Sequence, residues 1–242
     1  MAPTPTKSLT GMVAVVTGGS RGIGYAVAET LGPMGAAVMI TATSAERVGH
    51  AVHQLSAQGL ECEGFVCDVT DLKRVEELGA RVRDRYGRID VLVNNAGVGE
   101  KASLLHELQP ETWDRIFNTN VRGAYYMMRA VVPLMMESGG GHIINISSLA
   151  GKNPLPRGAA YSASKWALNG LSYSAAEELR SHNIRVSVVC PGSVDTEFSP
   201  HAGKSADQML RPEDVAHVVA MLVTQRSQSF VSEVLLRPTR KT

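Results

Sequence analysis

The sequence predicts an α/β fold of the doubly wound type, with one mostly parallel sheet of about seven strands and helices on both faces. Short apolar runs alternate along the chain with longer stretches of helical periodicity. This alternation is typical of repeated strand–helix–strand units. Several runs are rich in Val and Ile and are apolar on both alternating faces. Strands of a parallel sheet have this pattern because helices bury them from both sides.

The predicted strands are the apolar runs, and the predicted helices are the periodic stretches between them. The strands are Met12–Thr17, Ala37–Ala42, Cys62–Cys67, Val91–Asn94, His142–Ser147, Ile184–Pro191 and Val231–Leu236. The helices lie near residues 22–34, 44–58, 71–86, 110–137, 159–182 and 212–224.

Residues at the ends of the periodic stretches support these helix boundaries. The predicted starts carry capping side chains or prolines that suit a first helical turn: Ser44, Asp71, Pro110 and Pro212. The predicted stops carry glycines that permit a helix to end: Gly35, Gly59 and Gly87.

The length of 242 residues predicts a single domain, because α/β domains often reach this size. No repeat, low-complexity segment or linker interrupts the pattern. We expect the domain to cover residues 9–236. Residues 1–8 contain Pro and Thr and predict a flexible N-terminus, and residues 237–242 form a basic C-terminal tail.

The composition argues against nucleic-acid and membrane partners. The formal net charge is +1, and no basic cluster marks a surface for nucleic acid. No apolar run reaches the length of a membrane span, and residues 1–10 lack the apolar segment of a signal peptide. We therefore expect a cytoplasmic protein.

The cysteines and histidines predict no metal site. Cys62 and Cys67 lie in one short apolar segment and Cys190 ends another, so all three are expected to be small buried hydrophobic residues. A Cys-x4-Cys half-site has no second half in the sequence, and the seven His are scattered.

A glycine-rich loop follows the first predicted strand. It reads Thr17-Gly18-Gly19-Ser20-Arg21-Gly22-Ile23-Gly24 and leads into the first predicted helix. Glycines let the backbone turn sharply and approach a ligand closely. A helix N-terminus offers N–H groups and the positive end of a dipole to a phosphate. At this place in a doubly wound sheet, the loop predicts a dinucleotide site, although its Gly-x-x-x-Gly-x-Gly spacing differs from the more common Gly-x-Gly-x-x-Gly.

Tyr161 and Lys165 stand four residues apart in a predicted helix, so their side chains share one face. An ammonium beside a phenol favours the phenolate, and lowering a tyrosine pKa from ~10 to neutrality requires about 4 kcal/mol. A tyrosine with such a pKa exchanges a proton readily with a substrate oxygen. The alternative is a surface helix with a half-buried Tyr and a solvated Lys, because a short motif alone is only a hypothesis.

Further motifs follow the other predicted strands. They are Asp68 after the third strand, Asn94-Asn95-Ala96-Gly97 after the fourth, Asn120 in the long helix, Ser148 after the fifth strand and Pro191-Gly192 after the sixth. With these motifs, the glycine loop and Tyr161-x-x-x-Lys165, nearly the whole chain resembles the short-chain dehydrogenase/reductase family. It is most similar to single-domain reductases of the 3-oxoacyl-carrier-protein reductase type. The resemblance implies a Rossmann fold and hydride transfer between a nicotinamide dinucleotide and a carbonyl or alcohol substrate.

The resemblance implies four catalytic residues. Tyr161 would give a proton to the carbonyl oxygen during reduction and remove it in the reverse direction. Ser148 would hydrogen-bond the same oxygen and hold the substrate in place. Lys165 would bind the nicotinamide ribose and depress the Tyr161 pKa, and Asn120 would help to order a water that connects Lys165 to solvent.

Simpler explanations exist for several of these residues. Ser147 is the rival of Ser148, but the spacing of thirteen residues to the tyrosine favours Ser148. Asn118 is the rival of Asn120, and the motif Asn-x-x-Gly favours Asn120. In isolation either Asn would be a polar residue on a helix face, and Asp68 would be a turn or capping residue.

The resemblance also implies which residues contact the dinucleotide. The glycine loop would bind the pyrophosphate, the residues after the second to fourth strands would surround the adenosine, and those after the sixth strand would contact the nicotinamide. The implied cofactor-binding residues are Gly18, Ser20, Arg21, Gly22, Ile23, Gly24, Ala42, Thr43, Ser44, Asp68, Val69, Asn95, Ala96, Gly97, Tyr161, Lys165, Pro191, Gly192, Val194 and Thr196.

The end of the second predicted strand favours NADP(H) over NAD(H). Enzymes that use NAD usually place an acid there to bind the ribose 2′-hydroxyl, whereas this chain has Ala42. Arg21 in the glycine loop is placed to attract a 2′-phosphate, and Thr43 and Ser44 can donate hydrogen bonds to it. Arg47 is a further candidate contact, with a solvated side chain as the alternative.

The substrate pocket is expected to be lined by residues after Gly97, by Ala150–Leu155 and by Ser193–Leu210. The last segment predicts a mobile lid. Lys152 and Arg157 flank the expected entrance, but no basic cluster demands an acidic substrate. We expect a small carbonyl or alcohol compound of moderate polarity.

We expect a homodimer or homotetramer, because in the family the helices corresponding to 110–137 and 159–182 pair between subunits. The chain lacks the Gly-rich C-terminal stretch common among these relatives. Two other functions remain open: a 3-oxoacyl-acyl-carrier-protein reductase of fatty acid synthesis, and a non-catalytic sensor that binds a dinucleotide.

Overall fold

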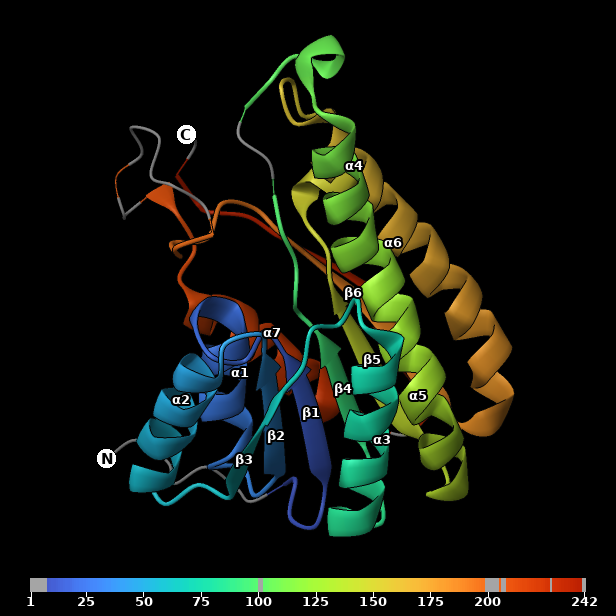
Figure 1. Ribbon diagram of the computed structural model, residues 1–242. Coiled ribbons are helices and arrows are strands. Elements are labelled where there is room, and N and C mark those ends of the chain that lie inside the picture. The colour runs from blue at the N-terminus through green and yellow to red at the C-terminus, as the bar shows by residue number, and fades with distance from the viewer. Residues whose placement is uncertain (1–7, 100–101, 199–204, 206–207, 227, 241–242) are drawn as a thin grey trace.

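The structure is a computed structural model that describes residues 8–99, 102–198, 205, 208–226 and 228–240. Within these residues, strands form one parallel sheet in the order β3-β2-β1-β4-β5-β6-β7 (Figure 1). The strands are β1 Val13–Thr17, β2 Ala37–Ala42, β3 Cys62–Val66, β4 Val91–Asn94, β5 Gly141–Ile146, β6 Ile184–Pro191 and β7 Glu233–Leu236. The predicted doubly wound sheet of seven strands is confirmed.

Helices cover both faces of the sheet, as the sequence predicts. The helices are α1 Gly22–Leu31, α2 Ala45–Ala57, α3 Leu72–Tyr86, α4 Pro110–Phe117, α5 Ala124–Glu137, α6 Ala159–Leu179 and α7 Pro212–Val223. Buried residues of α1, α2 and α7 pack in one hydrophobic cluster on one face. Those of α3, α5 and α6 pack in a second cluster on the other face.

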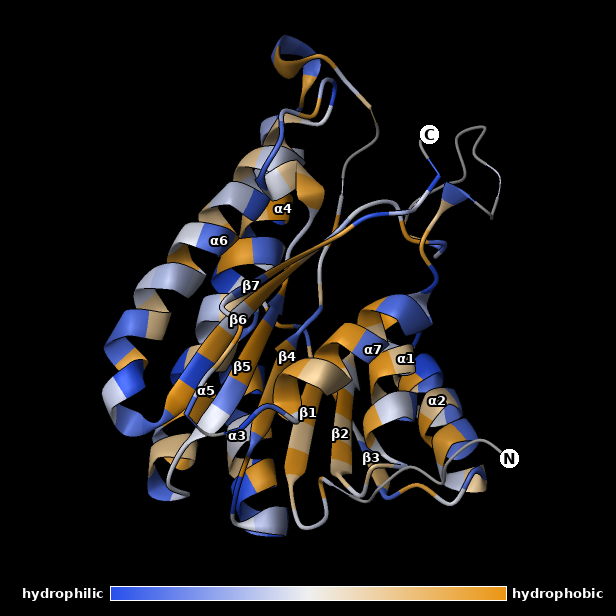
Figure 2. Ribbon diagram, turned by 180° about the vertical axis from the view of Figure 1, so that it is seen from behind, coloured by the Kyte–Doolittle hydropathy of each residue, from blue (hydrophilic) through white to orange (hydrophobic). Residues whose placement is uncertain are grey.

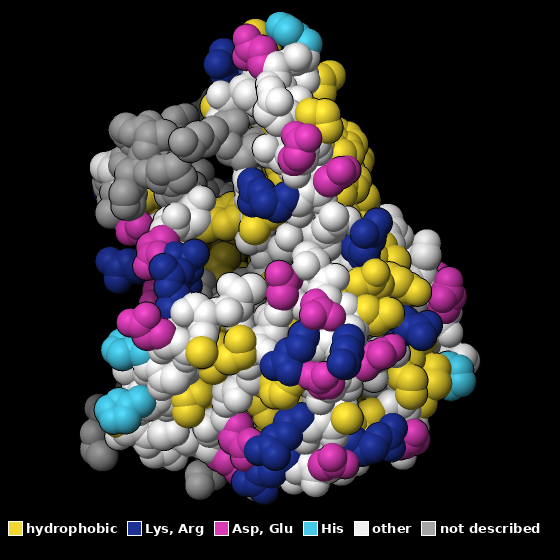
Figure 3. Space-filling model, in the orientation of Figure 1, with side chains coloured by type: hydrophobic (Ala, Val, Ile, Leu, Met, Phe, Trp, Pro, Cys, Tyr) yellow, Lys and Arg dark blue, Asp and Glu magenta, His cyan; other side chains and the backbone are white. Residues whose placement is uncertain are grey.

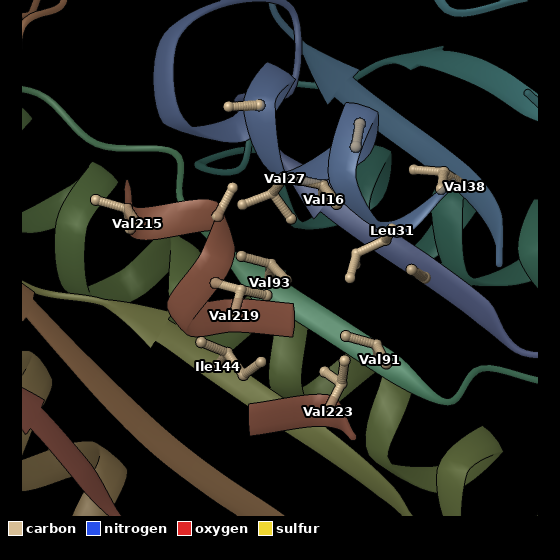
Figure 4. Packing of buried hydrophobic residues seen from close by; sticks show 14 of the residues in the cluster. Val16, Val27, Leu31, Val38, Val91, Val93, Ile144, Val215, Val219 and Val223 are labelled. Carbon is tan, nitrogen blue, oxygen red and sulfur yellow. The ribbon is translucent and has the colours of Figure 1, made fainter. Parts of the chain in front are cut away.

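The strands belong to both clusters because successive side chains point to opposite faces. In β1, Ala14 and Val16 pack on the α1 and α7 side, whereas Val13 and Val15 pack on the α3 and α5 side. Figure 4 shows hydrophobic side chains of β1, β2, β4 and β5 meeting those of α1 and α7. Seen from behind, β1, β2 and β4 are coloured hydrophobic over most of their length (Figure 2).

The capping signals of α2 and α3 act as predicted, whereas α1 ends at Leu31, ahead of the predicted stop at Gly35. Ser44 Oγ accepts a hydrogen bond from the Arg47 backbone N–H at 3.3 Å at the start of α2. Asp71 likewise caps α3. That helix ends at Gly87, which adopts the left-handed conformation (φ +70°) that favours glycine.

The long helix predicted over residues 110–137 is present but not regular. A π-helical turn at Asn118–Gly123 separates α4 from α5, and the three segments form one rod beside α6 in Figure 1. A π-turn inserts an extra residue into the helical repeat, and such turns are frequent at functional sites. The periodicity of the sequence did not reveal it.

Parts of three predictions lie outside the described residues. These are residues 1–7 of the flexible N-terminus, residues 241–242 of the basic tail, and residues 199–204 and 206–207 of the predicted lid. In the part of the chain that the structure describes, no helix is both long and apolar enough to cross a membrane.

Candidate active site

The candidate site lies where the order of the strands reverses. From β1 the chain builds outward to β2 and β3, then crosses to the other side of β1 to form β4. In open α/β sheets, ligands bind beyond the carboxyl ends of the strands at such a switch point. The glycine loop follows β1, and Asn95, Ala96 and Gly97 follow β4, so these motifs meet at this point.

The glycine loop has the backbone geometry that its sequence predicts. Gly18 and Gly22 both have positive φ, +63° and +54°, which a side chain rarely tolerates. A Cβ on Gly24 would lie only 2.4 Å from the Gly18 carbonyl oxygen. Arg21 precedes α1 without capping it through its side chain. The loop and the helix N-terminus therefore fit a bound pyrophosphate.

Two side chains tie the glycine loop to the loop after β4. Thr17 Oγ1 accepts hydrogen bonds from the backbone N–H groups of Asn95 and Ala96, both at 3.0 Å. In return, the Asn95 side-chain amide donates to the carbonyl oxygens of Thr17 at 2.9 Å and Gly18 at 3.1 Å. These bonds fix the distance between two loops that the sequence assigns to one dinucleotide. Thr17 belongs to the glycine-rich motif, but the sequence does not identify it as a site residue.

Asn120 lies in the π-turn, 2% exposed. Its side-chain oxygen accepts from the Val98 backbone N–H at 2.8 Å, and its amide nitrogen donates to the Val98 carbonyl oxygen at 2.9 Å. The same nitrogen donates to Ser164 Oγ at 3.0 Å, and Ser164 donates to the Tyr161 carbonyl oxygen at 2.7 Å. Asn120 thus links the loop after β4 to α6, through a serine that sequence reasoning missed.

Ser148 and its rival Ser147 have different surroundings. Ser148 follows β5 and hydrogen-bonds Tyr161, and its Oγ also accepts from the Ala150 backbone N–H at 3.1 Å. Ser147 is buried, and its hydroxyl donates to the Lys165 carbonyl oxygen at 3.4 Å. The geometry therefore places Ser148, rather than Ser147, beside the tyrosine.

Tyr161 and Lys165 share one face of α6. The Lys165 ammonium lies 5.7 Å from the centre of the Tyr161 ring and donates to the Ile146 carbonyl oxygen at 2.8 Å. The side chains of Asn120 and Lys165 both lie close to Gly97. A Cβ on this glycine would be 3.3 Å from Asn120 Oδ1 and 3.8 Å from Lys165 Nζ.

Burial dominates the electrostatics of this pair. It lowers the pKa of Lys165 to about 8. It raises the pKa of Tyr161 to about 12, and the hydrogen bond with Ser148 only partly opposes that rise. The net shift of the Tyr161 pKa is therefore upward rather than downward as predicted, because removal from water destabilises the phenolate more than its neighbours stabilise it.

The adenosine end of the site has no acid at the end of β2. Ala42 and Ser44 are half-buried and Thr43 is exposed. Arg21 projects from the glycine loop and forms an ion pair with Glu197, which lies beyond β6. The sequence did not anticipate this partner of Arg21.

Asp68 and Val69 follow β3. Asp68 Oδ1 accepts from both the backbone N–H and the hydroxyl of Thr70, at 2.9 and 2.8 Å, which is the turn role considered as its simpler explanation. Val69 is 5% exposed and packs against Gly123, where a Cβ would approach its side chain to 2.6 Å. Val69 therefore packs against the end of the π-turn at Gly123.

The segment after β6 lies beside the glycine loop. The Gly192 backbone N–H donates to the Leu236 carbonyl oxygen at 2.8 Å, and Val194 pairs with Leu210 in an isolated bridge. The Thr196 methyl lies 3.2 Å from where a Cβ on Gly22 would be. The predicted cofactor-binding residues after β6 therefore lie beside the glycine loop that follows β1.

Phe198 packs beside Tyr161. Its ring centre lies 5.9 Å from that of Tyr161, with a tilt of 47° between the planes. A Cβ on Gly99 would lie 3.3 Å from the same ring. Phe198 is 49% exposed. Figure 3 shows a hollow on this side of the molecule, with hydrophobic side chains inside it and charged side chains of both signs beside it.

Lys152, expected at the entrance, is already paired. Its ammonium lies 2.5 Å from Glu233 Oε1 on β7 and donates to the Tyr173 hydroxyl of α6. Tyr173 in turn donates to Glu233 at 2.7 Å. This cluster holds the turn after Ser148 against α6 and β7. Among the described residues, no group of three or more His, Cys, Asp or Glu is placed to hold a metal ion.

Comparison with known proteins decides the family. The family model described as short chain dehydrogenase matches residues 12–207. The chain belongs to the short-chain dehydrogenase/reductase family. This short-chain dehydrogenase/reductase is 35% identical over 227 residues to an uncharacterized oxidoreductase of Staphylococcus saprophyticus, covering 93% of this chain and 97% of the relative. It is therefore an oxidoreductase, and the predicted family is confirmed.

Two solved structures of similar proteins carry a dinucleotide. A metagenomic short-chain oxidoreductase in complex with NADP is 49% identical, with a TM-score of 0.85 over 97% of this chain and 100% of that chain. An alcohol dehydrogenase from the archaeon Thermococcus sibiricus, complexed with 5-hydroxy-NADP, is 32% identical, with a TM-score of 0.88 over 96% and 98% of the two chains. The narrower similarity to 3-oxoacyl-carrier-protein reductases stays a prediction.

Proposed function

We propose that this protein is an NADP(H)-dependent oxidoreductase that interconverts a carbonyl compound and a secondary alcohol, with Tyr161 as proton donor and acceptor. The observation that carries the proposal is the arrangement of Ser148, Tyr161 and Lys165 beyond the carboxyl end of β5. Three polar groups converge there beside a loop shaped for a pyrophosphate, which is what reduction of a bound carbonyl requires.

In the reducing direction, Tyr161 gives its phenolic proton to the substrate oxygen as that oxygen gains negative charge. Ser148 donates a second hydrogen bond to the same oxygen and holds the carbonyl carbon in line for attack. The nicotinamide, when bound, supplies the hydride that the carbon receives. Oxidation of the alcohol runs the same proton and hydride transfers in reverse.

The pKa values of the two side chains set their protonation states at neutral pH. Burial raises the pKa of Tyr161 to about 12, so the phenol is protonated, and its proton transfer requires that the phenolate be stabilised as it forms. Burial lowers the pKa of Lys165 to about 8, so most molecules carry the ammonium at pH 7. That positive charge, 5.7 Å from the ring centre, stabilises the phenolate left behind.

Two observations support NADP(H) over NAD(H). No carboxylate stands at Ala42, Thr43 or Ser44 to repel a 2′-phosphate, and the Arg21 guanidinium lies at the glycine loop. The two solved relatives were crystallised with NADP and with 5-hydroxy-NADP. We expect kcat/KM to be higher with NADPH than with NADH, and a preference for NADH would overturn this part of the proposal.

The surroundings of the site favour an uncharged substrate with an apolar part. Phe198, 49% exposed, offers apolar surface beside Tyr161. Lys152 is neutralised by Glu233 and is not free to bind an acid. A panel of ketones, aldehydes and a 3-oxoacyl thioester, followed by NADPH oxidation, tests the substrate class. Activity confined to the thioester would favour the acyl-carrier-protein reductase, and none across the panel would favour a dinucleotide sensor.

We also propose a homodimer or homotetramer that pairs through the α4–α5 rod and α6. These helices expose large aromatic side chains: Trp113, Tyr125, Trp166 and Tyr173. Exposed aromatic surface of this kind is typical of interfaces between subunits. Light scattering at micromolar concentration should give a mass of at least two chains, and a monomer would refute the assembly.

Tyr161→Phe tests the proton transfer. The variant keeps the ring but has no proton to donate, so turnover should be lost while NADPH still binds. Tyr86→Phe is the matched control, because that hydroxyl, in the last turn of α3, is buried and has no hydrogen-bond partner among the described residues. Full activity of the Tyr161 variant would contradict the mechanism.

A further inference from the structure

An ion pair joins the two segments that flank the expected dinucleotide. Arg21 belongs to the glycine loop and Glu197 to the segment after β6, and they are 176 residues apart in the sequence. The same segments also lie close together at a second point, because the Thr196 methyl is 3.2 Å from where a Cβ on Gly22 would be. Glu197 is thus held beside the guanidinium that the proposed function assigns to the 2′-phosphate.

The 2′-phosphate and the Glu197 carboxylate are both anions that would bind the positive charge of Arg21. A phosphomonoester carries about −1.5 to −2 charges near pH 7 and has three acceptor oxygens, whereas Glu197 offers one charge. Arg21 and Glu197 are 49% and 70% exposed, so their ion pair is weak and screened by salt. A dianionic phosphate can therefore displace the carboxylate, but the displacement reduces the net gain on binding.

We propose that Glu197 competes with the 2′-phosphate of NADP(H) for Arg21, and so sets how strongly the protein prefers the phosphorylated dinucleotide. The inference rests on the proposed function, because it assumes that Arg21 binds the phosphate. NAD(H) has a hydroxyl at this position and leaves the ion pair intact. The carboxylate consequently reduces the affinity for NADP(H) and leaves that for NAD(H) nearly unchanged.

Glu197→Gln removes the competing charge and preserves the size of the side chain. In titrations of the full chain followed by nicotinamide fluorescence at low salt, the Kd for NADPH should fall by about two- to fivefold, as expected for release of an exposed ion pair. The Kd for NADH should stay unchanged within experimental error. Raising the ionic strength should shrink the difference between the variant and the parent protein.

Glu177→Gln is the matched control. Glu177 pairs with Arg180 at the far end of α6, with exposures of 69% and 60%, so it reports the effect of removing any exposed carboxylate. A double-mutant cycle with Arg21→Ala completes the test. In the Arg21→Ala background, Glu197→Gln should no longer change the Kd for NADPH.

The outcomes separate this inference from the proposed function. A parent protein that binds neither dinucleotide, or prefers NADH, contradicts the proposed NADP(H) dependence itself. If the parent prefers NADPH but Glu197→Gln leaves its Kd unchanged, weakens it, or shifts both dinucleotides equally, then Glu197 does not compete for Arg21. A shift of NADPH alone, cancelled by Arg21→Ala, supports the competition.

Discussion

Thr17→Val isolates the hydrogen bonds that tie the glycine loop to the loop after β4. Valine has nearly the shape of threonine but no hydroxyl, and Thr17 is 1% exposed. The substitution removes the acceptor of two backbone N–H groups, those of Asn95 and Ala96. It also removes the donor of a longer bond to the Val93 carbonyl oxygen at 3.3 Å.

The expected cost follows from which groups lose their partners. The Asn95 N–H still reaches the Val93 carbonyl oxygen at 3.1 Å, so it is only partly deprived, whereas the Ala96 N–H loses the one acceptor seen for it among the described residues. Hydrogen bonds contribute about 1 kcal/mol net each, and an orphaned donor costs about 1–3 kcal/mol. We expect the free energy of unfolding to fall by about 2–3 kcal/mol.

Thr41→Val is the matched control. Thr41 faces Thr17 in the register of β2 with β1 and is 0% exposed, but its hydroxyl has no hydrogen-bond partner within the described part of the chain. Removing an unpartnered buried hydroxyl should be neutral or stabilising. Urea unfolding measures both variants, with the slope m as the check that the unfolded states are comparable. Equal destabilisation of the two would refute the reasoning.

Three further predictions concern the site and the acid stability. Gly24→Ala should weaken dinucleotide binding by roughly tenfold or more, because the new Cβ would lie 2.4 Å from the Gly18 carbonyl oxygen; an unchanged Kd would contradict the assigned loop. Glu233→Gln frees Lys152 and should lower kcat by roughly two- to tenfold with little change in KM, because the Ser148 turn loses an anchor; an effect confined to KM would argue for a direct substrate contact. Burial, helped by the charge of a nearby arginine, lowers the pKa of His142 to about 3, so stability should fall as pH drops from about 6.5 towards 3, where only the unfolded chain takes up the proton. His142→Gln should flatten that slope, and a slope equal to that of the parent protein would assign it to other groups.

The fold was predictable because burial on both sides leaves a strong trace in the sequence. Residues 13–16 are all apolar because successive side chains pack against helices on opposite faces of the sheet. That pattern predicts a strand of a parallel sheet even when the strands beside it are not known. The glycine loop was predictable for a similar reason. Gly18 and Gly22 stand where the backbone has positive φ, which few other residues permit.

The features that the sequence did not reveal depend on distant partners. Asn120 lies in a π-turn and its side-chain amide bonds the Val98 backbone. Sequence periodicity cannot show this, because one polar residue gives the same pattern in a π-turn and in a regular α-helical turn. Glu197 pairs with Arg21 across 176 residues of sequence, so no local spacing predicts this ion pair.

The pKa of Tyr161 illustrates a different limit. The four-residue spacing to Lys165 shows that the two groups are neighbours, but it does not show how far each is removed from water. Desolvation turns out to be the larger effect on both pKa values. Proximity alone therefore predicted the partner correctly and the direction of the shift wrongly.

The last strand has a practical consequence for anyone who works with this protein. Glu233 reaches across to Lys152, Leu236 accepts a hydrogen bond from Gly192, and Pro238 lies 3.0 Å from where a Cβ on that glycine would be. Residues 233–238 thus support the turn after Ser148 and the segment after β6 at once. A change that displaces β7 would therefore disturb two walls of the site together, although β7 itself carries none of the predicted site residues.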